Sequence, residues 1–218
     1  MSLVILGKRM RFPDPREADA EGLVAVGGDL SLERLLLAYR SGIFPWTANP
    51  VSWWSPDPRA IFELGEFHVS RSLARVVRQG GFRVTRDSAF RQVMEGCAAP
   101  GPGRRRTWIT AEFLEAYTGL HQAGHAHSVE CWQGDELAGG IYGVAVGGFF
   151  AGESMFHRVS NGSKVALYHL VRHLEGRGFT LLDIQMLTPI TTQLGGVTIP
   201  REQYLTRLAQ ALGKPCVF

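Results

Sequence analysis

Cysteines are few in this sequence, and long apolar runs are missing. The 218 residues contain three cysteines, Cys97, Cys131 and Cys216, with no Cys-x-x-Cys pair. Neither a disulfide framework nor a zinc site is therefore expected, and a reducing, cytoplasmic location is the simplest expectation. No apolar segment approaches the roughly 20 residues of a transmembrane helix, and the first residues lack the apolar core of a signal peptide. We therefore expect no membrane partner.

Sequence motifs for several common chemistries are missing as well. The chain has neither a Walker loop nor a G-x-G-x-x-G run, so nucleotide hydrolysis and Rossmann-type dehydrogenation are unsupported. His121, His125 and His127 lie close together but lack the Glu of H-E-x-x-H, and no metal is expected. The segment Gly152–Phe156 contains G-x-S but ends in Phe where a nucleophile elbow needs Gly. A serine hydrolase is therefore not indicated.

The positive charge of the chain is small but unevenly distributed. The formal net charge is +3, and the arginines gather between Arg71 and Arg106. A helix predicted after Ser70 exposes three of them, and three adjacent arginines stand directly before Thr107-Trp108. Arginine beside an aromatic ring suits a phosphate-plus-base contact, whereas a basic run is more often plain solvated surface. Both interpretations stay open on the pattern alone.

The first 60 residues are predicted to form a small N-terminal module. Gly27-Gly28-Asp29 leads into a helix whose apolar stripe continues to Tyr39 and which ends at Gly42. The segment 43–59 then mixes three tryptophans with prolines, which exclude a helix and disfavour a central strand. We predict a packed irregular loop here, and the functional alternative is an aromatic platform for a base or ring.

From residue 61 onward the pattern predicts regular helices and strands. Helices are expected to begin after the capping residues Ser70, Asp87, Thr110 and Thr188-Pro189, and at Ser163 and Pro200. Strands are expected at 62–69, 82–85, 127–133, 136–146, 149–156 and 179–187. Tight glycine-containing turns join the three strands between 127 and 156, which are therefore antiparallel. A β-meander, a helix and another strand indicate an α/β (α+β) domain, residues 61–218, on a mostly antiparallel sheet.

Two of these strands carry polar side chains that could perform chemistry. Asp183 and Gln185 stand two apart in the strand 179–187, so their side chains are expected on one face. A carboxylate and a carboxamide on an apolar strand need partners or a ligand, which makes both catalytic candidates. Glu153 lies in the aromatic strand after Gly147-Gly148, where an acid is costly unless it faces a pocket or water. The strand pattern favours the pocket.

Seven motifs in order along the chain resemble those of leucyl/phenylalanyl-tRNA–protein transferases. They are Val26–Leu30, Gly42–Trp46, Trp53–Arg59, Thr107–Ile109, His127–Glu130, Gly152–Phe156 and Asp183–Gln185. The resemblance covers nearly the whole chain. It implies an acetyltransferase-like catalytic domain, residues 61–218, preceded by a small N-terminal domain, residues 1–60.

The resemblance implies a reaction and its partners. A leucyl, phenylalanyl or methionyl group would move from its tRNA to the α-amine of a protein that begins with Arg or Lys. The product would carry a destabilising N-terminus for bacterial proteolysis, as in the N-degron pathway. No cofactor, metal or covalent enzyme intermediate is implied, and a monomer is expected.

The resemblance also implies roles for individual residues. Gln185 would accept a hydrogen bond from the attacking amine, and Asp183 would hold Gln185 or stabilise positive charge. Glu153 would hold the acceptor's cationic N-terminal side chain or amine. The apolar slot for the aminoacyl side chain would be formed by Phe150, Met155, Leu167 and Leu174. The aromatic residues near the terminal adenosine would be Tyr39, Trp46, Trp108 and Tyr117. The tRNA phosphates would be contacted by Arg71, Arg75, Arg78, Arg104, Arg105 and Arg106. For the two leucines, plain core packing explains the helical spacing equally well.

The sequence departs from the family pattern after the Asp-x-Gln strand. Ile190 and Gln193 stand where a His or Asn and a Ser are expected, which puts one polar contact in doubt. Two other functions are weighed against the transferase. A non-catalytic RNA-binding module would use the arginines and tryptophans but gives no reason for Asp183 and Gln185 to share a face. An acyl-CoA-dependent N-acyltransferase would need a phosphate cradle that the loop 158–163 lacks.

Overall fold

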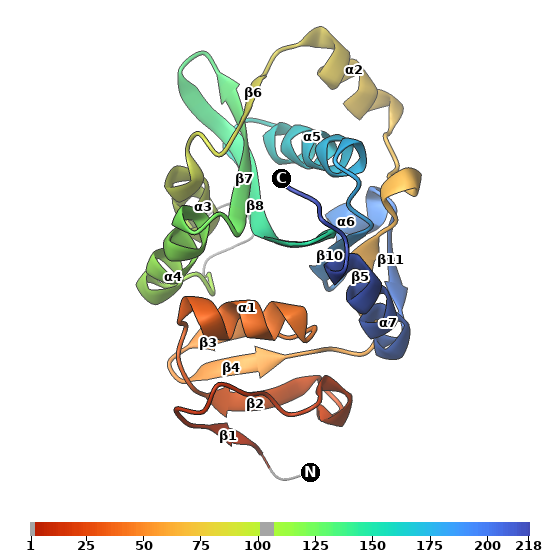
Figure 1. The fold of residues 1–218 in the computed structure, drawn as a ribbon. Coiled ribbons are helices and arrows are strands. Elements are labelled where there is room, and N and C mark those ends of the chain that lie inside the picture. Colours follow the sequence, from red (N-terminus) through yellow and green to blue (C-terminus); the bar gives the residue numbers. More distant parts are fainter. Residues whose placement is uncertain (1–2, 101–106) are drawn as a thin grey trace.

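The computed structural model describes residues 3–100 and 107–218, and it contains two β-sheets (Figure 1). The smaller sheet is formed by the N-terminal part of the chain. Its strands, in spatial order, are β1 (Ile5–Leu6), β2 (Leu23–Gly27), β4 (Val51–Trp54) and β3 (Phe44–Ala48). Helix α1 (Leu32–Arg40) lies between this sheet and the rest of the molecule (Figure 1).

The prediction of an irregular loop at 43–59 was wrong. This segment forms the antiparallel pair β3–β4, and β4 lies centrally between β2 and β3. Proline is tolerated because Pro45 lies in β3, which is an edge strand and needs fewer N–H donors. Trp53 in β4 is fully buried, and its Nε1 donates to the Gly27 carbonyl oxygen at 2.8 Å. The aromatic residues therefore build a sheet rather than a loop.

The larger sheet has seven strands. Their spatial order is β11 (Gly196–Ile199), β5 (Arg59–Phe62), β10 (Leu181–Gln185), β9 (Phe149–His157), β8 (Glu136–Val146), β7 (Ala126–Gln133) and β6 (Arg83–Arg86). All neighbours are antiparallel except β9 and β10, which run parallel. The predicted antiparallel meander β7–β8–β9 and the mostly antiparallel α/β sheet are confirmed.

Six further α-helices are described outside the N-terminal sheet. They are α2 (Arg71–Gln79), α3 (Phe90–Ala98), α4 (Ala111–Gln122), α5 (Gly162–Gly176), α6 (Pro189–Gln193) and α7 (Arg201–Leu212), with short 3₁₀ turns at Pro15–Glu17 and Leu64–Glu66. The predicted caps hold at α2, where Ser70 accepts from Leu73 N at 3.2 Å, and at α6, where Thr188 forms a capping box. Within the described ranges, no helix is long and apolar enough to cross a membrane.

Some local predictions were wrong. Asp87 does not cap α3, because the N-cap of this helix is Ala89. The Asp87 carboxylate instead accepts a hydrogen bond from Ser128 N at 2.9 Å and contacts His127. The predicted strand 62–69 ends at Phe62 because a 3₁₀ turn follows, and the strand begins earlier, at Arg59. Strand β11 was not expected from its sequence.

The core lies on both faces of the larger sheet, in two clusters. The first packs α1, α3, α4 and α7 against one face, and the second packs α2 and α5 against the other. Side-chain alternation assigns neighbouring strand residues to opposite clusters: Leu181 to the first and Leu182 to the second in β10, Phe149 to the first and Phe150 to the second in β9.

Candidate active site

The candidate site lies where the central strands β9 and β10 stop pairing with each other. They pair in parallel through only three residues each, from Leu181↔Phe149 to Asp183↔Ala151. β9 is then irregular against β8, and β10 has a bulge against β5 between Asp183 and Gln185. Bulges re-aim side chains at the ends of pairing. Glu153 and Gln185, one from each strand, consequently line the same hollow.

This hollow, the reactive hollow, has a volume of about 370 Å³. Two half-buried indoles contribute to its wall, Trp46 from β3 and Trp108 from the segment before α4. Its lining residues are Phe44, Pro45, Trp46, Trp108, Glu153, Ile184, Gln185, Met186, Leu187 and Thr188. Both sheets therefore contribute to one mostly apolar site with a few polar groups, as binding sites usually have.

Glu153 is held from behind by two buried tyrosines. Tyr39 of α1 donates to its Oε1 at 2.8 Å, and Tyr117 of α4 donates to its Oε2 at 3.3 Å. The two tyrosine hydroxyls also contact each other. No Lys or Arg within residues 3–100 and 107–218 forms an ion pair with this carboxyl group.

Burial raises the pKa of Glu153 to about 8, although the hydrogen bond from Tyr39 opposes this rise. The residue keeps part of its surface at the hollow, so water there offsets some of the effect of burial. A carboxyl group with such a pKa exchanges its proton near neutral pH, which is what an acid–base catalyst requires.

Gln185 is held in a rare backbone conformation. Its φ is +56°, and its backbone N–H donates to Asp183 Oδ1 at 2.9 Å. Positive φ is strained for a residue with a Cβ, and it persists only where surrounding contacts enforce it. The bulge and the Asp183 carboxylate supply these contacts.

The Gln185 carboxamide fits its surroundings in two orientations. In one, Nε2 donates to Glu153 Oε1 at 3.3 Å. Rotated by half a turn, Nε2 donates to the carbonyl oxygens of Gly152 and Ile184 at 3.0 and 3.1 Å. The rotated amide turns its oxygen toward Glu153, which suits a protonated carboxyl group, whereas the first orientation suits a carboxylate. The second makes more hydrogen bonds, so we assign the amide in that orientation, with its oxygen toward Glu153.

Asp183 is fully buried and saturated with donors. Arg59 binds it through both Nε and a terminal nitrogen at 2.9 and 2.7 Å, and Tyr204 donates to Oδ2 at 3.0 Å. Arg59 is buried as well, donates to the Gly42 carbonyl oxygen at 3.1 Å, and lies over the Phe44 ring. Buried charges need such pairing. Asp183 touches the reactive hollow only through Gln185.

The residues predicted for the aminoacyl slot lie in the core on the α5 side of the sheet. Phe150, Leu167 and Leu174 are at most 2% exposed, and half-buried Met155 packs against the same cluster. None of the four lines the reactive hollow. Tyr39 and Tyr117 reach it only through Glu153.

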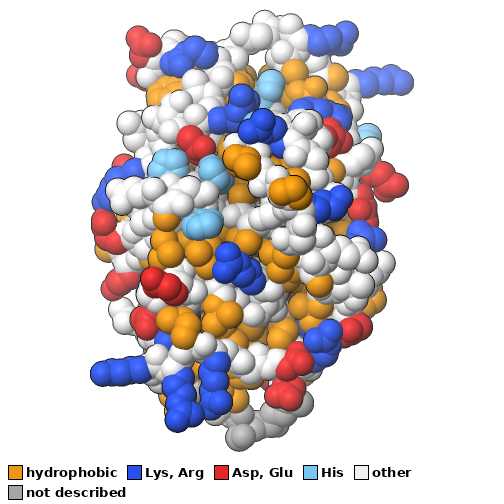
Figure 2. All heavy atoms as spheres, viewed as in Figure 1, with side chains coloured by type: hydrophobic (Ala, Val, Ile, Leu, Met, Phe, Trp, Pro, Cys, Tyr) orange, Lys and Arg blue, Asp and Glu red, His pale blue; other side chains and the backbone are white. Residues whose placement is uncertain are grey.

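The predicted phosphate-binding arginines fall into two groups. Arg71, Arg75 and Arg78 are exposed on α2. Their spacing places them on one face of the helix. Figure 2 shows Lys and Arg side chains projecting from the end of the molecule where Figure 1 places α2. The predicted contacts Arg104, Arg105 and Arg106 lie outside the described residues.

Sequence reasoning missed the partners of Asp183. The sequence pattern presents Arg59 only as the last residue of an aromatic motif, and Tyr204 only as part of an amphipathic stripe. Their pairing spans 124 and 21 positions in the chain, so no local pattern signals it. A charged residue at the start of an apolar strand was the available clue for Arg59.

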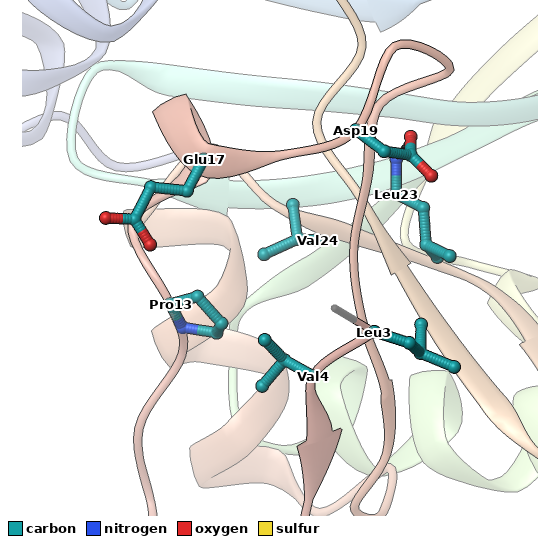
Figure 3. A pocket seen from close by; sticks show the side chains of 7 residues that line it. All are labelled: Leu3, Val4, Pro13, Glu17, Asp19, Leu23 and Val24. Atoms are coloured by element: carbon teal, nitrogen blue, oxygen red, sulfur yellow. Dashed lines mark hydrogen bonds between the residues drawn. The ribbon is translucent and has the colours of Figure 1, made fainter. Parts of the chain in front are cut away.

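A hollow of about 400 Å³ beside β1 has no indole in its lining, which is Leu3, Val4, Pro13, Glu17, Asp19, Leu23 and Val24. Its two carboxylates point in different directions (Figure 3). The Asp19 carboxylate there accepts from the backbone N–H groups of Glu21 and Leu23 and so serves a turn. Within the described ranges, no group of three or more His, Cys, Asp or Glu residues could hold a metal.

Fold and site together define a mixed α/β protein with one hollow that combines carboxyl, amide and indole groups. A carboxyl group that titrates near pH 8 lies beside an amide and two indoles, in a hollow shared by two sheets. Family models then match both parts of the chain: "Leucyl/phenylalanyl-tRNA protein transferase" at residues 61–209, and its "N-terminal domain" at residues 28–57.

Curated relatives agree with this match. The "Leucyl/phenylalanyl-tRNA--protein transferase" of Anaeromyxobacter dehalogenans (strain 2CP-C) is 49% identical over 218 residues, 99% of this chain and 94% of that protein. Its counterpart in Magnetococcus marinus is 53% identical over 211 residues, 94% and 89% of the two chains. The chain belongs to the leucyl/phenylalanyl-tRNA protein transferase family.

A solved structure, that of L-PGS from Bacillus licheniformis, is similar over 77% of this chain and 54% of its own, with 13% identity and a TM-score of 0.43. Nothing about activity follows from so low a likeness.

Proposed function

We propose that this protein transfers a leucyl, phenylalanyl or methionyl group from aminoacyl-tRNA to the α-amine of proteins that begin with Arg or Lys. The new N-terminal residue marks the acceptor for degradation. We further propose that it acts as a monomer in the cytoplasm. Family membership supports the reaction, and the reactive hollow supports a site for it.

One observation carries the chemical part of the proposal. Glu153 is an acid at a solvent-accessible hollow, with a neutral amide beside it and hydroxyl donors behind it. A site of this kind can hold an amine and take its proton, and no thiol or serine nucleophile is needed. The α-amine has an ordinary pKa of about 7.7–8.0, close to that of Glu153, so near pH 8 a neutral amine and an ionised Glu153 are both well populated.

The reaction exchanges one bond for another at the ester carbonyl. The neutral amine attacks the carbonyl carbon of the aminoacyl ester, the new C–N bond forms, and the C–O bond to the terminal ribose breaks. Glu153 accepts the amine proton as the C–N bond forms. It returns this proton to the ribose oxygen as that oxygen leaves. The enzyme therefore ends each cycle in the protonation state in which it began.

Gln185 and Asp183 act by positioning in this scheme. With its oxygen toward Glu153, the Gln185 amide can accept a hydrogen bond from the substrate amine or from the protonated carboxyl group. Asp183 fixes the backbone of Gln185 and has no free lone pair for substrate. Orientation of this kind contributes up to about 7–11 kcal/mol in favourable intramolecular reactions. Because its carboxylate already accepts from Arg59, Tyr204 and Gln185 N, Asp183 anchors Gln185 in this scheme rather than stabilising positive charge on the amine.

The two indoles provide surfaces for the terminal adenosine. Trp46 and Trp108 are half-buried on the wall of the hollow that also holds Glu153. Base stacking on an aromatic side chain is worth about 1–3 kcal/mol. The aminoacyl side chain then enters between β9 and β10 toward Phe150, Met155, Leu167 and Leu174, which must repack to admit it. Arg71, Arg75 and Arg78 contact tRNA phosphates, which are bound largely without sequence preference.

A transfer assay tests the proposed function. Radiolabelled Phe-tRNA is incubated with the protein and a peptide that begins with Arg, and the peptide product is identified by mass spectrometry. We expect one phenylalanyl residue on the α-amine, and none after RNase treatment of the tRNA or with an acetylated peptide. Binding of Phe-tRNA without any transfer would contradict the proposal and favour the non-catalytic RNA-binding function. Transfer from an acyl-CoA alone would favour the other rival.

A further inference from the structure

A second hollow adjoins the reactive hollow, and Trp46 lines both. Its volume is about 360 Å³, and it shares Phe44, Trp46 and Met186 with the reactive hollow. Its full lining is Glu21, Phe44, Trp46, Thr47, Trp54, Pro56 and Met186. We refer to it as the Glu21 hollow. A substrate anchored at Glu153 can therefore extend a side chain past Trp46 into it.

The walls of the Glu21 hollow are aromatic and apolar, with one acid at the edge. Trp46 and Trp54 meet edge to face, with ring centroids 5.7 Å apart and planes at 63°. Both indoles are half-buried and keep surface toward solvent. Glu21 is exposed, and among the described residues it is the one charged side chain of this lining. No ion pair of its carboxylate is found within residues 3–100 and 107–218.

The backbone holds Glu21 firmly in this place. Asp19 Oδ1 accepts from Glu21 N at 3.0 Å and from Leu23 N at 2.8 Å, which closes the turn. The carbonyl oxygen of Gly22 then accepts from Ser55 N at 2.7 Å. Gly22 has a φ of +98° and lies directly against Pro56, where a Cβ would come within 2.6 Å of the Pro56 Cα. The backbone at Glu21 is thus fixed next to Pro56, and the exposed side chain starts from there at the edge of the hollow.

We propose that the Glu21 hollow binds the cationic side chain of the acceptor's first residue, an inference that rests on the proposed function. Lys and Arg side chains have an apolar stem and a charged end, and this matches an apolar wall with a carboxylate at its rim. A cation is also attracted to the face of an indole. The alternative occupant, a second nucleotide stacked on Trp54, would bring a phosphate toward Glu21, and like charges repel.

This assignment divides the recognition of the acceptor between two acids. Glu153 handles the α-amine in the reactive hollow, and Glu21 selects the side chain in the adjoining one. Charge selection at Glu21 acts on binding of the acceptor, so it changes the KM for the peptide rather than the chemical step.

The test compares two acceptor peptides that differ only in charge at the first residue, Arg and its neutral isostere citrulline. Transfer of phenylalanine from Phe-tRNA is measured with the wild type, Glu21→Gln and Glu21→Arg. We expect Glu21→Gln to lower kcat/KM for the Arg peptide about three- to fivefold, as an exposed ion pair allows, through KM. The citrulline peptide and the KM for Phe-tRNA should not change. Glu21→Arg should reduce the preference for Arg over citrulline further, by more than tenfold relative to wild type.

Glu17→Gln is the matched control, because Glu17 is an exposed acid of the same segment that lines a different hollow (Figure 3). It should leave both peptides unaffected. Three results with Glu21→Gln would each overturn the subsite: an equal loss of kcat/KM on both peptides, an unchanged KM for the Arg peptide, or a rise in the KM for Phe-tRNA. If the wild type transfers nothing to either peptide, the proposed function itself fails, and the subsite fails with it.

Discussion

At the scale of single residues, the proposed mechanism depends on the protonation state of Glu153. Its carboxyl group has two tyrosine donors, an amide neighbour and no cationic partner among the described residues, and burial raises its pKa to about 8. Asp183 stands in the opposite situation, because Arg59 pairs with its charge, Tyr204 donates a hydrogen bond to it, and it does not line the hollow. Of the two acids that the sequence placed near the reaction, the structure therefore favours Glu153 for proton transfer.

The raised pKa of Glu153 predicts how stability depends on pH. Between about pH 4.5 and 8, the folded state keeps a proton that the unfolded state has released, so stability falls as pH rises through this range. Glu153→Gln removes this dependence and keeps an acceptor for Tyr39. We expect its melting temperature to exceed that of the wild type by a few degrees at pH 8 and to match it near pH 5. Thermal unfolding followed by circular dichroism at both pH values checks this, and a constant difference across pH would contradict it.

Gln185 is predicted to contribute to turnover without contributing to tRNA binding. Gln185→Ala should lower kcat about 10- to 100-fold, because the amine loses its orienting partner, while the KM for Phe-tRNA stays within twofold. Gln193→Ala serves as the control, since Gln193 is exposed on the neighbouring α6. Steady-state transfer kinetics separate the two constants. A Gln185→Ala enzyme with normal kcat would remove Gln185 from the mechanism.

At the scale of elements, the parallel pair β9–β10 and the bulge in β10 create the site. The bulge depends on a buried ion pair that connects β5 to β10, with Tyr204 of α7 as a third partner. Breaking a buried ion pair by removing one partner costs about 3–5 kcal/mol, because the remaining charge is left uncompensated.

Arg59→Met is therefore expected to lower the free energy of unfolding by about 3–5 kcal/mol. The double variant Arg59→Met/Asp183→Leu should recover much of this loss, since it leaves no buried charge. It should still transfer poorly, because the backbone N–H of Gln185 loses its acceptor. Urea unfolding and the transfer assay together check this prediction. Full activity in the double variant would show that the network does not position Gln185.

Much of the fold was predictable from local patterns, and the long-range contacts were not. The β7–β8–β9 meander followed from alternation and from glycines at its turns, and α2 and α6 from their capping residues. The β3–β4 pair was missed because proline argues against strands unless edge position is known, and sequence does not reveal the edge. Sequence also placed Asp183, Gln185 and Glu153 near the site, but not the donors that distinguish their roles. Those donors come from Arg59 and from helices that pack onto the sheet.

At the scale of the whole molecule, the two sheets share the reactive hollow, while α2 lies at the far end from the small sheet (Figure 1). A bound tRNA that reaches both places would lie along the length of the protein. Arg71, Arg75 and Arg78 have no acidic partner among the described residues, in contrast to Arg91 and Arg172, which pair with glutamates. The α2 arginines are thus free to meet phosphates.

Replacing Arg71, Arg75 and Arg78 together by Gln should lower the affinity for tRNA. It should also make that affinity less dependent on salt concentration. The slope of log affinity against log salt should shrink by about two to three, since each lost phosphate contact removes roughly 0.7–0.9. The KM for the acceptor peptide should not change. Filter binding at several salt concentrations measures the slope, with Arg91→Gln/Arg172→Gln as the control. An unchanged slope in the triple variant would exclude α2 from the tRNA interface.

The most direct test of the account is the pH profile of single-turnover transfer from Phe-tRNA to an Arg-starting peptide, for wild type and Glu153→Gln. Below pH 7 the wild type needs both a neutral amine and an ionised Glu153, so log rate should rise with pH at a slope clearly above one and level off near pH 8. Glu153→Gln should be at least 100-fold slower, with a slope of one set by the amine alone. A variant with the wild-type rate and the wild-type profile would contradict the role of Glu153 and the mechanism built on it.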